Sequence, residues 1–75
     1  MTPQKLLEYC ISEISDLSTG EAFIVRDLFK GYEWVRLPRA SRITLGTLFF
    51  NYASNCDVLK LVGKTAQGQQ KYEKL

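Results

Sequence analysis

Residues 38–74 read PRASRITLGTLFFNYASNCDVLKLVGKTAQGQQKYEK, and this stretch decides the expected fold. Its first part places Leu45, Phe49 and Tyr52 at three- and four-residue spacing, which gives an apolar stripe on one face of a helix. A proline stands at the start, where it loses no helical hydrogen bond. The pattern predicts a helix from Pro38 to Ser54.

The second part of the stretch changes to strand-forming residues. Val58–Val62 is rich in β-branched and apolar side chains, Ala66–Gln69 has the composition of a turn, and Gln70–Lys74 can return as a second strand. A β-hairpin is therefore expected within Val58 to Leu75. A long helix followed directly by a hairpin is typical of the last part of a winged helix.

Upstream of Pro38 the pattern predicts two more helices. Apolar residues at helical spacing predict the first, Pro3–Leu17. Ala22–Ile24 is expected to form a short edge strand, and Val25–Lys30 a short second helix ended by Gly31 in a left-handed cap. Tyr32–Leu37 is then a connector to the third helix.

The resulting order is helix, short strand, helix, helix and hairpin, within one domain covering residues 1–75. It predicts an α+β fold like a winged helix-turn-helix, with three helices, a C-terminal hairpin and a short strand after helix one. Gly46 in the middle of a helix is most simply explained by close packing against another helix. The predicted core consists of Leu7, Ile11, Ile14, Phe23, Leu28, Phe29, Trp34, Leu45, Leu48, Phe49 and Leu61.

Charge is distributed unevenly along the chain. Up to Trp34 there are three basic and six acidic residues, whereas from Val35 onward there are seven basic and two acidic residues, for a net charge of +2. This asymmetry favours a basic surface that suits a polyanion. A solvated surface of mixed charge explains the same composition nearly as well.

The composition argues against an enzyme or a metalloprotein. The chain has no histidine, which is the commonest general base and metal ligand, and its two cysteines, Cys10 and Cys56, lack the spacing of a zinc site. We expect reduced thiols without chemistry, no catalytic residues, no metal and no cofactor. With no apolar run that could cross a bilayer and no apolar signal segment, a cytoplasmic protein without membrane contact is expected.

The remaining signal is the pairing of a basic helix with a basic, amide-rich hairpin. Arginines gather near the amino end of the third helix, and lysines and glutamines, including Gln69 and Gln70, are found on the hairpin. Such groups can bind phosphates or the edges of bases. The candidate nucleic-acid-binding residues are Arg36, Arg39, Arg42, Thr47, Asn51, Lys64, Gln67 and Lys71.

Several short motifs also resemble a known family. They are Gly20–Phe29, Glu33-Trp34, Leu37-Pro38, Arg42, Leu45-Gly46, Phe49, Gly63–Thr65 and Gln69–Tyr72. Together they are similar to a family of small uncharacterised proteins from Gram-positive bacteria and their phages. The resemblance covers about three quarters of the chain. It supports the fold and the compartment, and it implies no activity and no site residue.

Two functions from different classes stay open. In the first, the protein is a winged-helix DNA-binding or regulatory module that uses the third helix and the hairpin on double-stranded DNA, as a homodimer because one small domain binds weakly. In the second, it is a protein–protein interaction adaptor or inhibitor of phage or mobile-element origin that acts on a host protein. Phe50 beside Ile43 is the candidate anchor for that host protein, although burial of Phe50 between neighbouring elements is the expectation.

Overall fold

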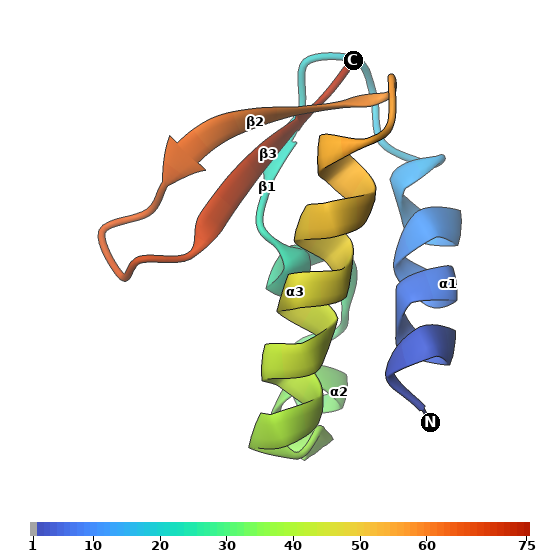
Figure 1. Ribbon diagram of the computed structural model, residues 1–75, viewed down its shortest axis with the longest axis vertical. Coiled ribbons are helices and arrows are strands. Elements are labelled where there is room, and N and C mark those ends of the chain that lie inside the picture. Colours follow the sequence, from blue (N-terminus) through green and yellow to red (C-terminus); the bar gives the residue numbers. More distant parts are fainter. Residues whose placement is uncertain (1) are drawn as a thin grey trace.

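The computed structural model describes residues 2–75, so Met1, which the predicted domain includes, lies outside the described residues. Three α-helices pack beside a three-stranded antiparallel sheet, which confirms the predicted mixed α+β fold and the order of its elements (Figure 1). The elements are α1 (Pro3–Ile14), β1 (Ala22–Phe23), the 3-10 helix η1 (Val25–Leu28), α2 (Gly31–Arg36), α3 (Arg39–Ser54), β2 (Leu59–Lys64) and β3 (Gln70–Lys74).

Helix α1 begins as predicted and ends three residues early. The Thr2 hydroxyl accepts a hydrogen bond from the Lys5 amide at 3.2 Å, which caps the amino end. After Ile14 the amides of residues 15–17 bond to carbonyls three residues back instead of four. The prediction that the helix reaches Leu17 is therefore wrong, because the last turn tightens and leaves the helical path.

The second helical segment differs from the prediction. Val25–Leu28 is a 3-10 turn, and the α-helix that follows begins at Gly31 and occupies the predicted connector. The reason is local capping by two acids. An oxygen of Asp27 accepts the Ile24 amide at 3.0 Å, and an oxygen of Glu33 accepts the Lys30 amide at 3.1 Å. Each acid starts a new helical segment, and Gly31, which has no positive φ, is a first residue and not a cap.

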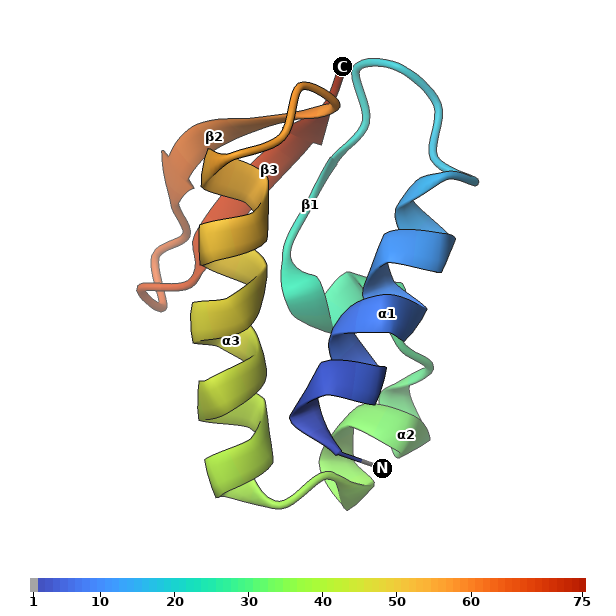
Figure 2. The same cartoon turned by 45° about the vertical axis from the view of Figure 1, so that its right-hand side comes forward.

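Helix α3 begins one residue after the predicted start and ends at the predicted Ser54. It lies alongside α1 in both cartoon views (Figures 1 and 2). Leu45, Phe49 and Ala53 face the core and are buried. The hydroxyl of Ser54 donates to the carbonyl of Phe50 at 2.8 Å, so this polar side chain is satisfied where the helix ends.

The sheet has the order β1-β3-β2, so the short strand β1 is an edge strand as predicted. Strand β3 covers the predicted residues, whereas β2 runs from Leu59 to Lys64 instead of from Val58 to Val62. The pairing of β2 with β3 is irregular between Leu61 and Lys64, where Gly63 has a φ of 106°. This irregularity allows β2 to continue past the predicted end.

The core is built around three aromatic rings. Phe49 of α3 packs against Tyr72 of β3 with ring centroids 4.9 Å apart, and Phe23 of β1 lies 5.7 Å from Tyr72. Burial raises the pKa of Tyr72 to about 12. Burial likewise raises the pKa of the Cys10 thiol to about 12, so this thiol stays protonated at neutral pH.

Most of the predicted core residues are buried or packed against the core. Leu61 is the exception, since 39% of it is exposed. The prediction was wrong because Leu61 lies on β2, the outer strand of the sheet, and stays partly exposed there although its partner on β3, Tyr72, is buried. Leu59, two residues earlier on the strand, is buried instead.

Candidate nucleic-acid interface

A groove runs between α3 and the β2–β3 hairpin and consists of two adjoining hollows. Both hollows are lined by Gly46, Gln70 and Tyr72, which lie where they meet. The inner hollow, called the inner cleft here, has a volume of about 190 Å³ and is also lined by Ile24, Val25, Arg26, Trp34, Arg42 and Gln69. The outer hollow has a volume of about 340 Å³ and is also lined by Thr47, Phe50, Lys64 and Gly68.

Arg42 is the central side chain of the inner cleft. Its guanidinium carbon lies 5.9 Å from the centre of the Trp34 ring, within the range of a cation–π contact. Its Nε is buried and has no hydrogen-bond partner among residues 2–75. Packing against Trp34 leaves Arg42 half-buried. An unpaired charged donor of this kind costs free energy unless a ligand or water supplies an acceptor.

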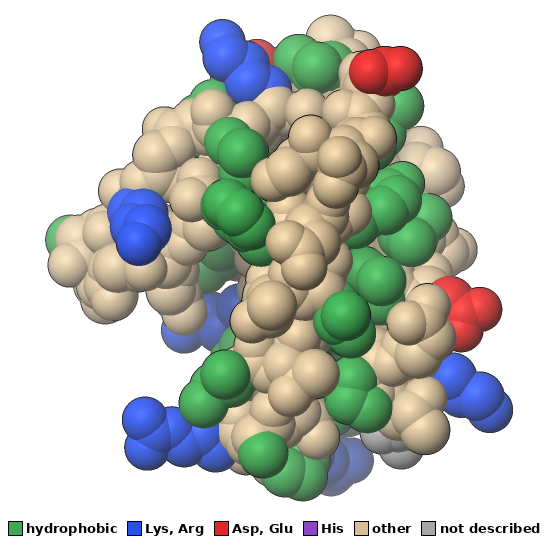
Figure 3. Space-filling view, in the orientation of Figure 1, with side chains coloured by type: hydrophobic (Ala, Val, Ile, Leu, Met, Phe, Trp, Pro, Cys, Tyr) green, Lys and Arg blue, Asp and Glu red, His purple; other side chains and the backbone are tan. Residues whose placement is uncertain are grey.

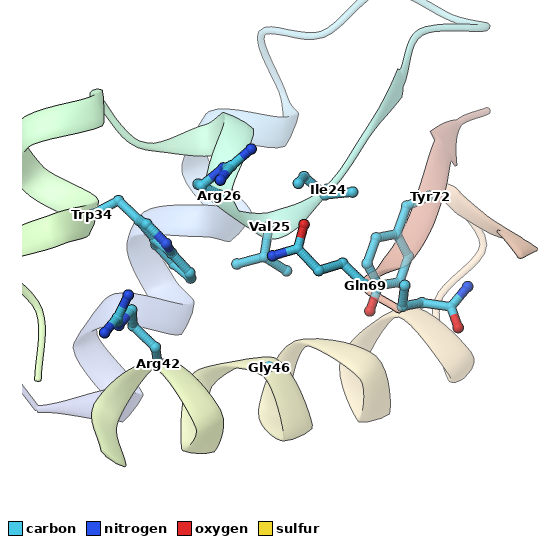
Figure 4. A pocket seen from close by; sticks show the side chains of 9 residues that line it. Ile24, Val25, Arg26, Trp34, Arg42, Gly46, Gln69 and Tyr72 are labelled. Carbon is cyan, nitrogen blue, oxygen red and sulfur yellow. The ribbon is translucent and has the colours of Figure 1, made fainter. Parts of the chain in front are cut away.

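Helix α2, which occupies the segment predicted as a connector, explains how Trp34 reaches the cleft. Helix α2 carries Trp34 on the side that faces α3, and the ring packs against Phe29 with centroids 5.6 Å apart. The 3-10 turn η1 brings Val25 and Arg26 to the facing wall. Figure 4 shows Arg26 and Arg42 on facing walls, with the Gln69 side chain reaching in from the hairpin.

The outer hollow presents mixed chemistry. Lys64 at the end of β2 supplies an ammonium group, and Phe50 supplies an aromatic surface. The hydroxyl of Thr47 donates to the carbonyl of Ile43 at 3.4 Å, so its oxygen is left to accept a hydrogen bond. Cation, aromatic ring and hydroxyl are the groups that contact phosphates and bases.

The charge distribution on this face fits an anionic ligand. In the space-filling view, Lys and Arg side chains lie over the hairpin and around the lower end of α3, whereas Asp and Glu side chains appear only at the upper and right-hand edges, where Lys and Arg side chains are also present (Figure 3). Two acids near the cleft in sequence are engaged elsewhere, since Asp27 and Glu33 accept hydrogen bonds from backbone amides. No acidic side chain of residues 2–75 lines either hollow of the groove.

The structure brings only some of the predicted residues into the groove. Arg42, Thr47 and Lys64 line it. Arg36 lines a different cleft, between α1 and α2, and its guanidinium lies 5.0 Å from the Tyr32 ring centre. The remaining candidates do not line the groove and are exposed on α3 or on the hairpin, namely Arg39, Asn51, Gln67 and Lys71.

Arg26 and Trp34 are lining residues that sequence reasoning did not select as site residues. Trp34 was expected in the core, and Arg26 belongs to the acidic half of the chain, so neither stood out. Gln69 and Gln70 were noted on the hairpin and do line the groove. No local pattern connects Arg26 with Arg42, because they line the same cleft from two elements that are distant in the sequence, η1 and α3.

Gly46 does not pack closely against another helix, which overturns the explanation drawn from the sequence. A Cβ built on Gly46 meets no atom within 4 Å among the described neighbours. The residue instead lies at the junction of the two hollows. Its missing side chain keeps the floor of the groove open at the expense of helix stability.

We therefore expect Gly46→Ala to raise the free energy of unfolding by about 1 kcal/mol, since alanine favours a helix over glycine by about that amount. Urea denaturation followed by circular dichroism measures the change. Gly63→Ala is the matched control, because the φ of 106° at Gly63 strains any side chain, so the same substitution there should destabilise. If Gly46→Ala instead lowers the free energy of unfolding, the added methyl group must meet neighbouring atoms, which would mean that the groove is closed in solution.

A strip of apolar side chains lies beside the groove on α3. Phe50 is 43% exposed and Ile43 is 61% exposed, whereas the neighbouring Phe49 is fully buried. The expectation that Phe50 is buried is therefore wrong. The hairpin covers the face of α3 that carries Phe49 and leaves the adjacent face open.

Residues 2–75 contain neither a metal-binding cluster nor a membrane-spanning helix. These residues contain no group of three or more His, Cys, Asp or Glu side chains placed to hold a metal ion. None of the helices that they form is both long enough and apolar enough to traverse a membrane.

Comparison with known proteins gave two similarities. Residues 8–74 match the model of the family described as "Domain of unknown function (DUF1413)". The fold is similar to a solved structure described as "SCCmec type IV LP1413 - nucleic acids binding protein", with a TM-score of 0.79 and 23% sequence identity over 97% of this chain and 86% of that one. No curated protein sequence matched the chain significantly.

Proposed function

The chain belongs to the DUF1413 family, a domain of unknown function, so its function has to be inferred from the chemistry of the groove. We propose that the protein is a non-enzymatic winged-helix module that binds nucleic acid. The single observation that carries the proposal is the buried, unpartnered Nε of Arg42 in a groove that also presents Lys64 and Thr47. A charged donor kept without a partner is explained most directly by an anionic ligand.

The arrangement of the elements supports this proposal. Helix α3 lies beside the hairpin, as the third helix and the wing do in a winged helix, so one ligand can contact both. The solved structure with the similar fold is described as a nucleic acids binding protein. This description supports the proposal that this chain also binds nucleic acid.

The proposed roles follow from side-chain chemistry and position. Arg42 and Lys64 bind phosphate oxygens inside the groove, and the exposed Arg39 and Lys71 add contacts on the flanks of α3 and the hairpin. The other candidates on these elements, Thr47, Asn51 and Gln67, have side chains that can bond to base edges. Arg36 has no place in this proposal, since it lines another cleft.

The test is a titration of the protein with mixed-sequence duplex DNA over a range of salt concentrations. Four phosphate contacts, from Arg39, Arg42, Lys64 and Lys71, predict that log K falls against log salt with a slope between about −3 and −4. Fluorescence anisotropy of labelled DNA measures the affinity. Single-stranded DNA of the same length in a parallel titration shows whether a duplex is required, as the docking of α3 in a major groove predicts.

Failure to bind either form of DNA at low salt would contradict the proposal. Binding without salt dependence would also contradict it, since phosphate contacts always release counterions.

A second candidate function has a specific observation in its favour. The exposure of Phe50 and Ile43 on α3 provides an apolar strip that can anchor a partner protein, whether a host protein or a second copy of this chain. The strip borders the basic groove, so an acidic partner protein would fit the same face. This candidate becomes the first choice if the chain binds no DNA at low salt.

A further inference from the structure

We propose that the inner cleft is a binding site for a phosphate group, held between the guanidinium groups of Arg42 and Arg26 beside the Trp34 ring. A phosphate in the backbone of a nucleic acid and the phosphate of a free small molecule share this chemistry. The first source rests on the proposed function, whereas the second does not require it.

The cleft is lined by two charged hydrogen-bond donors, Arg26 and Arg42. A guanidinium carries five N–H groups in a fixed fork that matches the oxygens of a phosphate. In Arg42 the Nε of this fork is buried and lacks an acceptor among residues 2–75. The rest of the half-buried Arg42 side chain borders the cleft, and a shift of this side chain would bring the Nε to a phosphate oxygen, which would supply that acceptor and remove the cost of the unpaired donor.

Charge in the cleft favours the same ligand. Arg26 on the facing wall adds a second cation, and no acidic side chain lines the cleft within residues 2–75 (Figure 4). Because the Arg26 side chain is exposed, it can move toward a bound group without breaking core contacts. Two cations and no acid give the cleft a positive potential that a dianion would neutralise.

The walls of the cleft strengthen hydrogen bonds to a phosphate and leave room for it. Ile24, Val25 and Trp34 make part of the lining apolar, which lowers the local dielectric constant and strengthens charge-assisted hydrogen bonds. The amide of Gln69, reaching in from the hairpin, can donate a further bond (Figure 4). The volume of about 190 Å³ leaves room for a phosphate group with some of its water.

Trp34 is the only tryptophan of the chain, so its fluorescence reports on this cleft. The experiment titrates inorganic phosphate into the full chain at neutral pH, with sodium chloride keeping the ionic strength constant. We expect a saturable change in Trp34 emission, and an affinity about ten-fold or more lower in both Arg26→Ala and Arg42→Gln.

Arg36→Ala is the matched control. It removes an arginine that lines the separate cleft between α1 and α2, so it should leave the titration unchanged. Because Arg26 is exposed, its substitution should leave the fold intact, so the inference stays testable even if the half-buried Arg42 proves necessary for folding. No saturable change, or an unchanged affinity in Arg26→Ala, would overturn the inference.

Competition with duplex DNA distinguishes the two sources of phosphate. If phosphate binds and DNA displaces it, the cleft holds a phosphate of the nucleic-acid backbone. If phosphate binds and the protein binds no DNA, the ligand is a free phosphate compound, and the proposed function fails while the cleft site stands. If DNA binds while phosphate does not, and Arg26→Ala has no effect on DNA affinity, the cleft site fails and the proposed function stands.

Discussion

Replacing Phe49 with alanine is expected to lower the free energy of unfolding by about 3–5 kcal/mol. Phe49 is fully buried, and its ring contacts those of Tyr72, Phe23 and Tyr52 with centroids 4.9, 6.2 and 6.2 Å away. The substitution therefore leaves a cavity where α3 meets the sheet. A small domain has only about 5–15 kcal/mol of stability, so this single change removes a large part of it.

Phe50→Ala is the matched control for this prediction, since Phe50 is the next residue on the same helix and is 43% exposed. Its loss should cost less than about 1.5 kcal/mol because less apolar surface returns to water. Urea denaturation of the three proteins, followed by circular dichroism, measures both changes. Equal losses at the two positions would mean that α3 is rotated from the orientation described.

The second large effect is a loss of DNA affinity, which we expect in the double variant that carries Arg39→Ala and Arg42→Ala. Removing two cations should weaken binding to all sequences alike and flatten the salt slope by about one to two units. The structure separates the two roles. Arg42 has a buried Nε in the groove, whereas Arg39 is exposed at the first residue of α3, so Arg42→Ala alone should cause the larger loss.

Anisotropy titrations at several salt concentrations measure this effect, with Arg36→Ala as the control of equal charge in a different cleft. Thermal unfolding of each variant shows whether the fold survives, which matters because Arg42 packs against Trp34. Full affinity in the double variant would remove the main support for nucleic-acid binding. The apolar strip of Ile43 and Phe50 would then become the preferred functional surface.

Elements that depend on local pattern could be predicted from the sequence. The start of α1 follows from Thr2 and Pro3, and the long apolar stripe of α3 follows from its periodicity. The segment 25–36 could not be predicted correctly in the same way. Its glycine suggested the end of a helix, but Asp27 and Glu33 cap two separate short segments, and the capping depends on which backbone amide each acid reaches.

Burial along strand β2 shows a second limit of prediction from the sequence. Leu59 and Leu61 have the same period and the same side-chain chemistry, yet only Leu59 is buried. Alternation along a strand predicts which face a residue lies on, but it contains no information about where the core stops. The position of β2 at the edge of the sheet, outside β3, decides that point.

By itself, the sequence determined the order of the elements, the aromatic core around Phe49 and the presence of basic residues on α3 and the hairpin. The tertiary structure alone decided which of these residues share a groove. Arg26 and Trp34 join Arg42 because η1 and α2 line the same cleft as α3, while Arg36 turns toward α1. The physical reason is that periodicity reports the neighbours of a residue within its own element, whereas a cleft forms between elements whose packing depends on side chains far apart in the chain.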